Sequence, residues 1–146
     1  MIALLQRVTS ASVSIAGRET ASIEAGLLCL IGVQPDDNEH TAGVLLKKIL
    51  NYRVFSDQQD RMNLSLRDCA GELLLVPQFT LAADTRSGLR PGFSTAAKPD
   101  LGAKLFGILC DMAAESDVEC QFGVFGADMQ VALINDGPVT FWLQAN

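Results

Sequence analysis

Two short segments of this 146-residue chain could do chemistry without a metal or an acid–base side chain. The first, residues 77–81, reads Pro-Gln-Phe-Thr-Leu and ends a strongly apolar stretch. Because proline cannot donate to a β-ladder, the strand should fray or bulge there and free the backbone amides of Gln78, Phe79 and Thr80. Free amides beside a side-chain amide and a hydroxyl could hold an oxyanion, as acyl-transfer enzymes do. From these five residues alone, an ordinary edge strand with polar residues facing water is the favoured interpretation.

The second segment, residues 136–139, reads Asp-Gly-Pro-Val and lies near the C-terminus. A bond before proline is cis in only about 5–6% of cases in folded proteins, so a plain turn is the default interpretation. If the bond between Gly137 and Pro138 were cis, adjacent carbonyls could point the same way as a rigid acceptor pair. Such a pair could bind an α-ammonium group and leave no room for a side chain of the wrong hand.

The usual catalytic and metal-binding side chains are scarce. His40 is the only histidine and sits in an acidic turn, so it cannot build a His-rich metal site and has no candidate nucleophile to activate. The cysteines form no C-x-x-C pair, which removes support for zinc-ribbon and thioredoxin-type functions. We expect no metal site and four free, structural thiols: Cys29, Cys69, Cys110 and Cys120.

The net charge of −6 is unevenly distributed, because every Lys and Arg lies at or before Lys104. Affinity for phosphates comes largely from Lys and Arg, so extensive contact with nucleic acid is not expected. Any contact with RNA should be confined to a small end of it, and the best basic candidates are Arg86, Arg90, Lys98 and Lys104. No apolar run approaches a membrane span, and the start lacks a signal-peptide pattern, so the cytoplasm is the expected location.

The periodicity predicts a single α+β domain over residues 1–146, with two mostly antiparallel sheet layers and helices packed on one side. Residues 26–33 are continuously apolar, which is typical of a strand covered on both faces. Helices are predicted from Asp36 or Asp37 to about residue 51, and from Pro99 with a core stripe of Leu101, Leu105, Ile108 and Met112. The predicted strands are 2–8 and 12–15 as a hairpin, 26–33, 52–55, 72–81, 118–124, 129–134 and 139–144.

The two segments, their order and their separation resemble the D-aminoacyl-tRNA deacylase family, which proofreads chirality on charged tRNA. The resemblance extends over essentially the whole chain and implies a three-layer sandwich of two sheets and helices. The segments that resemble the family are residues 1–8 with Arg7, 51–57, 62–64, 79–84, 90–91, 128–131 and 135–142.

The resemblance implies a homodimer that cuts the ester bond between a D-amino acid and the terminal ribose of tRNA, without metal or organic cofactor. Gly137 and Pro138, joined by a cis bond, would enter the active site of the other subunit and screen the substrate. Arg7 would brace that cross-subunit motif. Because glycine has no side chain, glycyl-tRNA should pass the same screen and be a second substrate.

The same resemblance gives residues 77–81 a catalytic role. Gln78, Phe79 and Thr80 would line the aminoacyl pocket, with Pro77 beside them and Met129 near it. The mechanism would rely on the ribose 2′-hydroxyl, with backbone amides around Phe79 and Thr80 polarising the carbonyl. Thr80 as a covalent nucleophile is the competing mechanism, and it would need an activating base.

Two alternative functions remain open at this point. The family usually has Ser where this chain has Pro77, and a sister branch of tRNA deacylases also carries Pro there, with a trans Gly-Pro bond. That branch tolerates some L-amino acids but has a smaller residue in place of Phe79, and turnover of L-alanyl-tRNA would reveal it. The other alternative is a non-catalytic module that binds the charged ends of tRNA.

Overall fold

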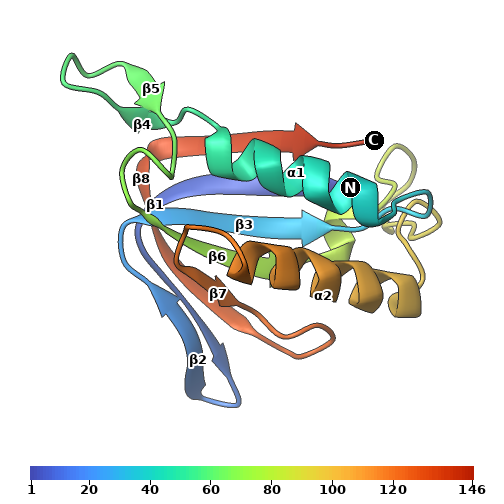
Figure 1. The fold of residues 1–146 in the computed structure, drawn as a ribbon. Helices are drawn as coiled ribbons and strands as arrows, with labels where there is room; N and C mark the ends of the chain where they lie inside the picture. Colours follow the sequence, from blue (N-terminus) through green and yellow to red (C-terminus); the bar gives the residue numbers. More distant parts are fainter.

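Eight strands, two α-helices and one 3-10 turn make up the fold in the computed structural model, which describes all residues 1–146 (Figure 1). The helices are α1 (Glu39–Asn51) and α2 (Pro99–Ala114), and the 3-10 turn is η1 (Phe79–Ala82). The strands are β1 (Ile2–Ile15), β2 (Arg18–Ile23), β3 (Gly26–Gly32), β4 (Phe55–Ser56), β5 (Met62–Leu64), β6 (Glu72–Pro77), β7 (Cys120–Phe122) and β8 (Gln130–Gln144). Neither helix is long and apolar enough to cross a membrane.

One bent sheet forms both of the predicted layers. Its order is β2-β1-β3-β6-β7, and β8 pairs with the remaining edge of β1, while β4 and β5 form a separate small sheet. Pairings with β1 are antiparallel, whereas β3 pairs with β6, and β6 with β7, in parallel. β1 pairs with β3 along its first half and with β2 along its last part, so the strand carries the sheet from one layer to the other.

The predicted hairpin over residues 2–8 and 12–15 is wrong, because this segment is the single strand β1. Residues 129–134 and 139–144, predicted as separate strands, likewise form the single strand β8. The ladder between β1 and β8 shifts register near Val8, and such bulges let a strand bend strongly without reversing direction. The breaks in the strand pattern that suggested turns therefore mark bends within the single strands β1 and β8.

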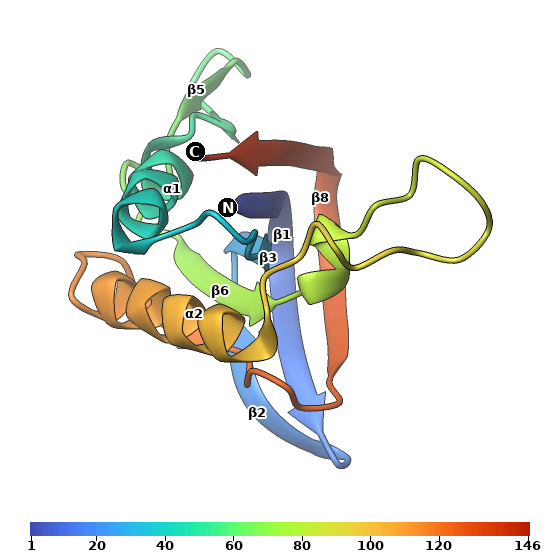
Figure 2. The same cartoon turned by 90° about the vertical axis from the view of Figure 1, so that its right-hand side faces the viewer.

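Apolar side chains fill two cores, one on each face of β3 and β6. On one face Cys29 and Leu75 belong to a core of 24 buried residues that includes side chains of both helices. On the other face Leu28 and Leu74 belong to a core of eight buried residues, which joins them to the far half of β1 and to β2. Figure 2 shows both helices on one side of the sheet. The predicted α+β architecture is therefore confirmed.

Helix α1 starts slightly later than predicted. Its N-cap is Asn38, whose side chain accepts from the Thr41 amide at 3.1 Å, while the Asn38 amide donates to the Thr41 hydroxyl at 2.8 Å. This capping box satisfies backbone donors that the helix leaves free. Asp37 has another role: its buried carboxylate pairs with the α-ammonium group of Met1 and accepts from the Gln34 amide at 2.6 Å.

Helix α2 begins at Pro99, as predicted, and Lys98 gives it no side-chain cap. Its buried face is rotated from the predicted stripe, of which only Leu105 is fully buried. Phe106 and Leu109 take the other central positions, since the helix packs against both the sheet and α1. The remaining residues of the predicted stripe, Leu101, Ile108 and Met112, are partly buried against the core.

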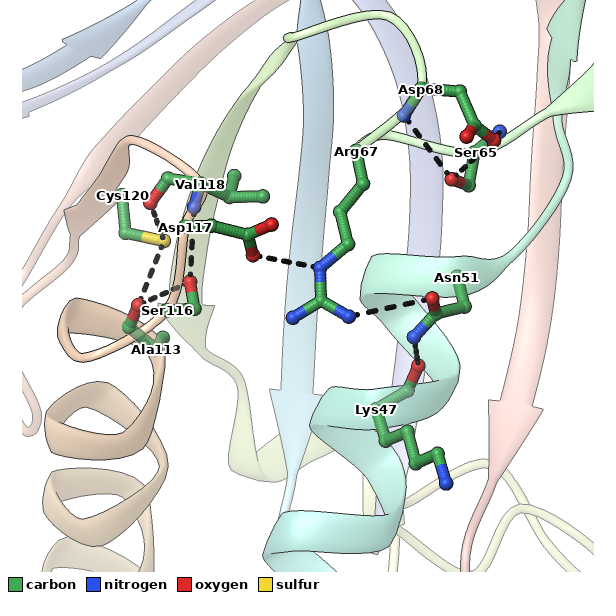
Figure 3. A network of polar contacts seen from close by, with 10 residues as sticks. All are labelled: Lys47, Asn51, Ser65, Arg67, Asp68, Ala113, Ser116, Asp117, Val118 and Cys120. Carbon is green, nitrogen blue, oxygen red and sulfur yellow. Dashed lines mark hydrogen bonds and ion pairs between the residues drawn. The ribbon is translucent and has the colours of Figure 1, made fainter.

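A polar network ties the helix ends together at the side of the molecule opposite the start of α1 (Figure 3). Arg67, in the loop before β6, pairs with Asp117 at 2.8 Å and donates to the Asn51 side chain at 3.5 Å. Asp117 follows α2, and Asn51 ends α1. Exposed pairs of this kind stabilise a fold by about 0–1 kcal/mol, so the network adds little to the stability that core packing provides.

Candidate functional site

Strand β6 ends at Pro77, and the chain then turns into the 3-10 turn η1. Pro77 lies opposite Ile31 in the parallel ladder with β3, and the strand predicted to reach residue 81 stops here. Gly32, at the end of β3, allows η1 to pack closely. A Cβ atom there would lie 3.2 Å from the Leu81 Cβ and 3.4 Å from the Gln78 carbonyl oxygen.

Two consecutive backbone amides are free at this turn. The amide of Gln78, which was predicted to be free, donates to the Ile31 carbonyl at 2.7 Å, so that prediction is wrong. The amides of Phe79 and Thr80 make no hydrogen bond within the chain. They open η1, and the first N–H groups of a helical turn have no carbonyl behind them. The turn therefore presents two adjacent donors.

The side chains around these amides are polar on one side and aromatic on the other. The Gln78 side-chain amide donates to the Thr80 hydroxyl, which fixes both groups relative to each other. Phe79 is 56% exposed, and its ring lies 5.2 Å from that of Phe93 at a tilt of 50°. Phe93 comes from the long loop between η1 and α2.

Two adjoining cavities open at the end of β6. The first, of about 310 Å³, has Pro77, Gln78, Phe79 and Met129 among its lining residues. The second, of about 480 Å³, is lined mainly by apolar residues of β3, α2 and the loop before it. The two share Pro77, Phe79, Phe125 and Gly126. Four of the predicted site residues, separated by up to 52 positions in sequence, therefore line one cavity.

Met129 packs directly over the end of β6. Its sulfur accepts from the Val124 amide at 3.4 Å. A Cβ atom at Gly123 would lie 3.1 Å from this sulfur and 3.1 Å from the Pro77 ring, so glycine permits the close approach. Sequence reasoning missed the aromatic residues Phe93 and Phe125 of these walls. Their position in Gly-containing turns, where large apolar residues are unusual, was the available signal.

The other predicted motif lies inside β8. Asn135 pairs with Val8 and Thr140 pairs with Gln6, so residues 136–139 bulge out of the ladder between them. The bond between Gly137 and Pro138 is cis, as the resemblance implied, and Gly137 has a φ of +144°.

Arg7 holds this bulge from the neighbouring strand. Its guanidinium donates to the Asp136 carbonyl at 3.1 Å and to the Val54 carbonyl at 2.6 Å, and it pairs with the Asp136 carboxylate at 3.1 Å. The Asn135 side chain donates to the Arg7 carbonyl at 2.9 Å and to the Val139 carbonyl at 3.0 Å. The bulge is thus fixed by contacts within its own chain.

The two motifs lie far apart within one chain. Arg7, beside the bulge, is level with Leu27 of β3, whereas Pro77 is level with Ile31. At about 3.3 Å per residue this separates them by about 13 Å along the strands. Strands β1 and β3 also lie between β8 and β6, which adds about 14 Å at the usual strand spacing of about 4.8 Å. The cavity at β6 and the bulge in β8 are therefore not parts of one site in a single chain.

Known proteins share much of the sequence that carries this geometry. The sequence matches the family described as "D-Tyr-tRNA(Tyr) deacylase" over residues 4–144. The chain belongs to this family. Its relatives include proteins named "D-aminoacyl-tRNA deacylase" from Pseudomonas putida, 59% identical over 144 residues, and from Proteus mirabilis, 52% identical over 144 residues. In both comparisons the match covers 99% of this chain and 99% of the relative.

Two solved structures share this fold. The structure titled "c-Myc DNA Unwinding Element Binding Protein" matches with a TM-score of 0.94 and 34% identity, covering 100% of this chain and 99% of that one. A probable eukaryotic D-amino acid tRNA deacylase matches with a TM-score of 0.85 and 16% identity over 97% of each chain, which shows a shared fold alone. The family model and the curated relatives confirm the predicted family.

The cavities of this deacylase-family member are lined by two ionisable side chains, Asp128 in the smaller and Lys98 in the larger, and by no Ser, Cys or His. Burial raises the pKa of the Cys29 thiol strongly and that of Cys110 to about 12, so both thiols are protonated near neutral pH. All four cysteines are free, and His40 is exposed on α1. The structure contains no group of three or more His, Cys, Asp or Glu side chains that could hold a metal ion. The site therefore presents two N–H donors, an amide, a hydroxyl and largely apolar walls that also include Asp128 and Lys98.

Proposed function

We propose that this chain hydrolyses the ester bond of D-aminoacyl-tRNA and releases free D-amino acid and tRNA. Membership in the deacylase family supports the reaction class, a carboxylic ester hydrolase acting on aminoacyl-tRNA. The observation that carries the assignment to a site is the pair of free amides, Phe79 and Thr80, beside the cavity at the end of β6. Such donors are what acyl transfer needs, because negative charge develops on the carbonyl oxygen.

The reaction follows from these groups. Water adds to the ester carbonyl carbon, and the developing oxyanion accepts hydrogen bonds from the amides of Phe79 and Thr80. The bond to the ribose oxygen then breaks, and that oxygen leaves with a proton. One such donor typically contributes about 100- to 1000-fold in rate. The cavity walls include Lys98 and Asp128, but Gln78, Phe79 and Thr80 carry no basic side chain, so we assign the assistance of proton transfer to the ribose 2′-hydroxyl of the substrate.

Thr80 acts by positioning in this mechanism. A threonine nucleophile needs a base to take its proton, yet the Thr80 hydroxyl accepts a hydrogen bond from the Gln78 amide group instead. Gln78 and Thr80 thus hold each other beside the two free donors. Their contribution is to orient the substrate carbonyl toward those amides.

The two cavities divide the substrate between them. The cavity of about 310 Å³, which includes Gln78 and Met129 in its wall, receives the aminoacyl group. The adjoining cavity of about 480 Å³ has the size and apolar character of a nucleoside-binding pocket, and it receives the terminal adenosine. Phe79 and Pro77 line both cavities, so the scissile ester would lie beside them.

Chiral screening is assigned to Gly137 and Pro138 of a second copy of the chain. Two observations support this: the bulge lies far from the cavity of its own chain, and it sits on β8, the sheet edge that pairs only with β1. A bulge from a second subunit would reject L-amino acids through backbone contact with the amino acid. Glycyl-tRNA would pass. The working form is then a cytoplasmic homodimer that needs neither metal nor organic cofactor.

Parallel incubation of the purified protein with labelled D-tyrosyl-tRNA and L-tyrosyl-tRNA, with and without a chelator, tests this function. We expect release from the D form alone, insensitive to the chelator, and release from glycyl-tRNA as well. Equal release from D- and L-tyrosyl-tRNA would show that the chain has no chiral screen. Turnover of L-alanyl-tRNA would assign it to the sister branch. Release from none of these substrates would leave a module that only binds charged tRNA.

Mixing two defective variants tests the cross-subunit assignment. Phe79→Pro lacks one free amide, and Gly137→Ala disturbs the bulge, so each homodimer has two damaged sites. A mixed dimer regains one site with intact Phe79 from one chain and intact Gly137 from the other. Partial recovery of D-aminoacyl-tRNA hydrolysis after joint refolding is expected. No recovery, with mixed dimers shown to form, would place the motif outside the partner's site.

A further inference from the structure

Residues 84–92 form a closed loop that projects from the molecule beside the cavities, drawn in yellow in Figure 2. Asp84 and Gly92 close it with two backbone hydrogen bonds of 2.7 and 2.9 Å. The Asp84 carboxylate also accepts two hydrogen bonds from the Arg86 guanidinium, at 2.8 and 2.7 Å. Leu89, near the tip, is fully exposed. The base of the loop is therefore held firmly, while its far end makes little contact with the rest of the chain.

Positive charge is concentrated here in a chain whose net charge is −6. Asp84 is neutralised by Arg86, which holds the pKa of that carboxyl well below its usual range. Arg90 and Lys98 form no ion pair, whereas Lys104, another basic candidate from the sequence, pairs with Glu39 at 3.5 Å. The loop and the segment leading to α2 thus carry two unneutralised positive charges.

The loop continues directly into the cavity wall. Phe93 follows it and packs on Phe79. The Thr95 hydroxyl then donates to the Ala82 carbonyl at 2.6 Å, and the Ala97 amide donates to the Val33 carbonyl at 2.9 Å. An ester bound at the end of β6 would therefore have its nucleotide chain leave the cavity past this loop.

We propose that residues 84–92 bind the phosphate backbone at the acceptor end of tRNA, with Arg90 contacting a phosphate group. The Asp84–Arg86 pair braces the loop for this contact, and the proposal rests on the function proposed above. Charge complementarity selects RNA as the occupant, because phosphate affinity comes from Lys and Arg that displace counterions. It also accounts for an acidic protein that acts on tRNA: contact is confined to one small basic surface.

The test compares Arg90→Gln with Arg90→Lys and with a matched control, Arg61→Gln. Arg61 is exposed and belongs to the β4–β5 hairpin, which Figure 1 shows at the opposite end of the molecule from the loop. Each variant is assayed on D-tyrosyl-tRNA and on the D-tyrosyl ester of adenosine, which lacks phosphates, over a series of salt concentrations.

We expect Arg90→Gln to raise KM for D-tyrosyl-tRNA about three- to fivefold and to reduce the salt slope of binding by about 1. Its kcat, and both parameters for the adenosine ester, stay unchanged, which also shows that the variant is folded. Arg90→Lys restores most of the affinity, and Arg61→Gln behaves as the parent protein. A KM for tRNA unchanged in Arg90→Gln, or raised equally in Arg61→Gln, overturns the proposal.

Failure of the loop proposal is distinguishable from failure of the proposed function. If the parent protein hydrolyses neither ester, the function is wrong, and binding of uncharged tRNA by fluorescence anisotropy still tests the loop. Weaker binding by Arg90→Gln than by Arg61→Gln then supports the phosphate contact. Equal binding by the two variants refutes it and leaves the loop as a surface for a protein partner.

Discussion

Strands β6 and β8 are both interrupted at a proline, but the two interruptions have different results. At Pro77 the chain leaves the sheet, and the turn that follows exposes two amides and a phenylalanine beside a cavity. At Pro138 the chain stays in its strand, and the bulge is tied to its own sheet by Arg7. The first interruption creates a place for a substrate. The second creates a rigid projection on a sheet edge.

The contrast teaches how a site can work with few ionisable groups. Each motif offers mainly backbone groups: donors at Phe79 and Thr80, and carbonyls around Gly137. Backbone groups are held in place by the fold, so they are preorganised for a developing charge or for a fixed chiral centre. Four predictions separate the two regions, from the largest expected effect to the smallest.

The amide at Phe79 should matter more than its ring. Phe79→Ala removes the ring alone, whereas Phe79→Pro also removes the N–H at the first position of η1, a position that proline commonly takes in helices. We expect kcat for D-tyrosyl-tRNA to be a further 100- to 1000-fold lower, roughly, in Phe79→Pro than in Phe79→Ala. Single-turnover kinetics and circular dichroism measure both variants. Equal rates would show that this amide does not stabilise the oxyanion.

Gly137→Ala should disturb the bulge without unfolding the protein. The added Cβ would lie 2.6 Å from a Val139 methyl group and 2.8 Å from the Val139 amide, so the backbone must shift. Misplacement by about 1 Å can reduce turnover about 100-fold. The matched control is Gly17→Ala, which also has a positive φ but has no atom within 4 Å of the new Cβ. In Gly137→Ala the turnover of D-tyrosyl-tRNA should fall and that of L-tyrosyl-tRNA should change. Gly17→Ala should turn over both substrates as the parent protein does.

Thr80→Ala distinguishes positioning from covalent catalysis. Loss of one hydrogen bond to Gln78 corresponds to about 1 kcal/mol, so we expect a decrease in kcat of about tenfold or less. Loss of a nucleophile would lower kcat by about a million-fold. Burst-phase assays with D-tyrosyl-tRNA would also reveal any acyl-enzyme intermediate. A million-fold loss or a burst would support the nucleophile mechanism at β6.

Arg7→Gln should destabilise the fold more than Arg67→Gln does. The Arg7 side chain is only 13% exposed and donates to the carbonyls of Val54 and Asp136, so its loss leaves the carbonyl of the buried Val54 unpaired. We expect the free energy of unfolding in urea to fall by about 1–3 kcal/mol. Arg67 is 38% exposed in its pair with Asp117, and its loss should cost about 0–1 kcal/mol. Equal losses would mean that Arg7 does not hold the bulge.

Sequence reasoning succeeded where the signal was local. The buried strand over residues 26–33, the start of α2 at Pro99 and the family were all predicted, and each is confirmed. It failed at positions where a distant partner decides the outcome. The amide of Gln78 was predicted to be free, but the Ile31 carbonyl of β3 is aligned to accept from it.

The cap of α1 and the strand count illustrate the same limit. Asp37 is a good N-cap residue in isolation, yet the ammonium group of Met1 reaches its carboxylate and Asn38 caps the helix instead. The breaks in residues 1–15 and 129–144 read as turns. Long-range pairing with one another makes each segment a single bent strand. No periodicity within either segment contains that information.

The order of residues alone is enough to predict an α+β chain of the deacylase family and the two motifs that could carry its chemistry. The fold class follows from residue type and short spacing, and the family from the resemblance of the motifs, and both are visible along the chain. The tertiary structure alone decides that the amide of Gln78 is bonded while those of Phe79 and Thr80 are free, and that the bulge lies away from the cavity of its own chain. Those facts depend on which strands pair and in which register, and a register is set by contacts between residues far apart in sequence.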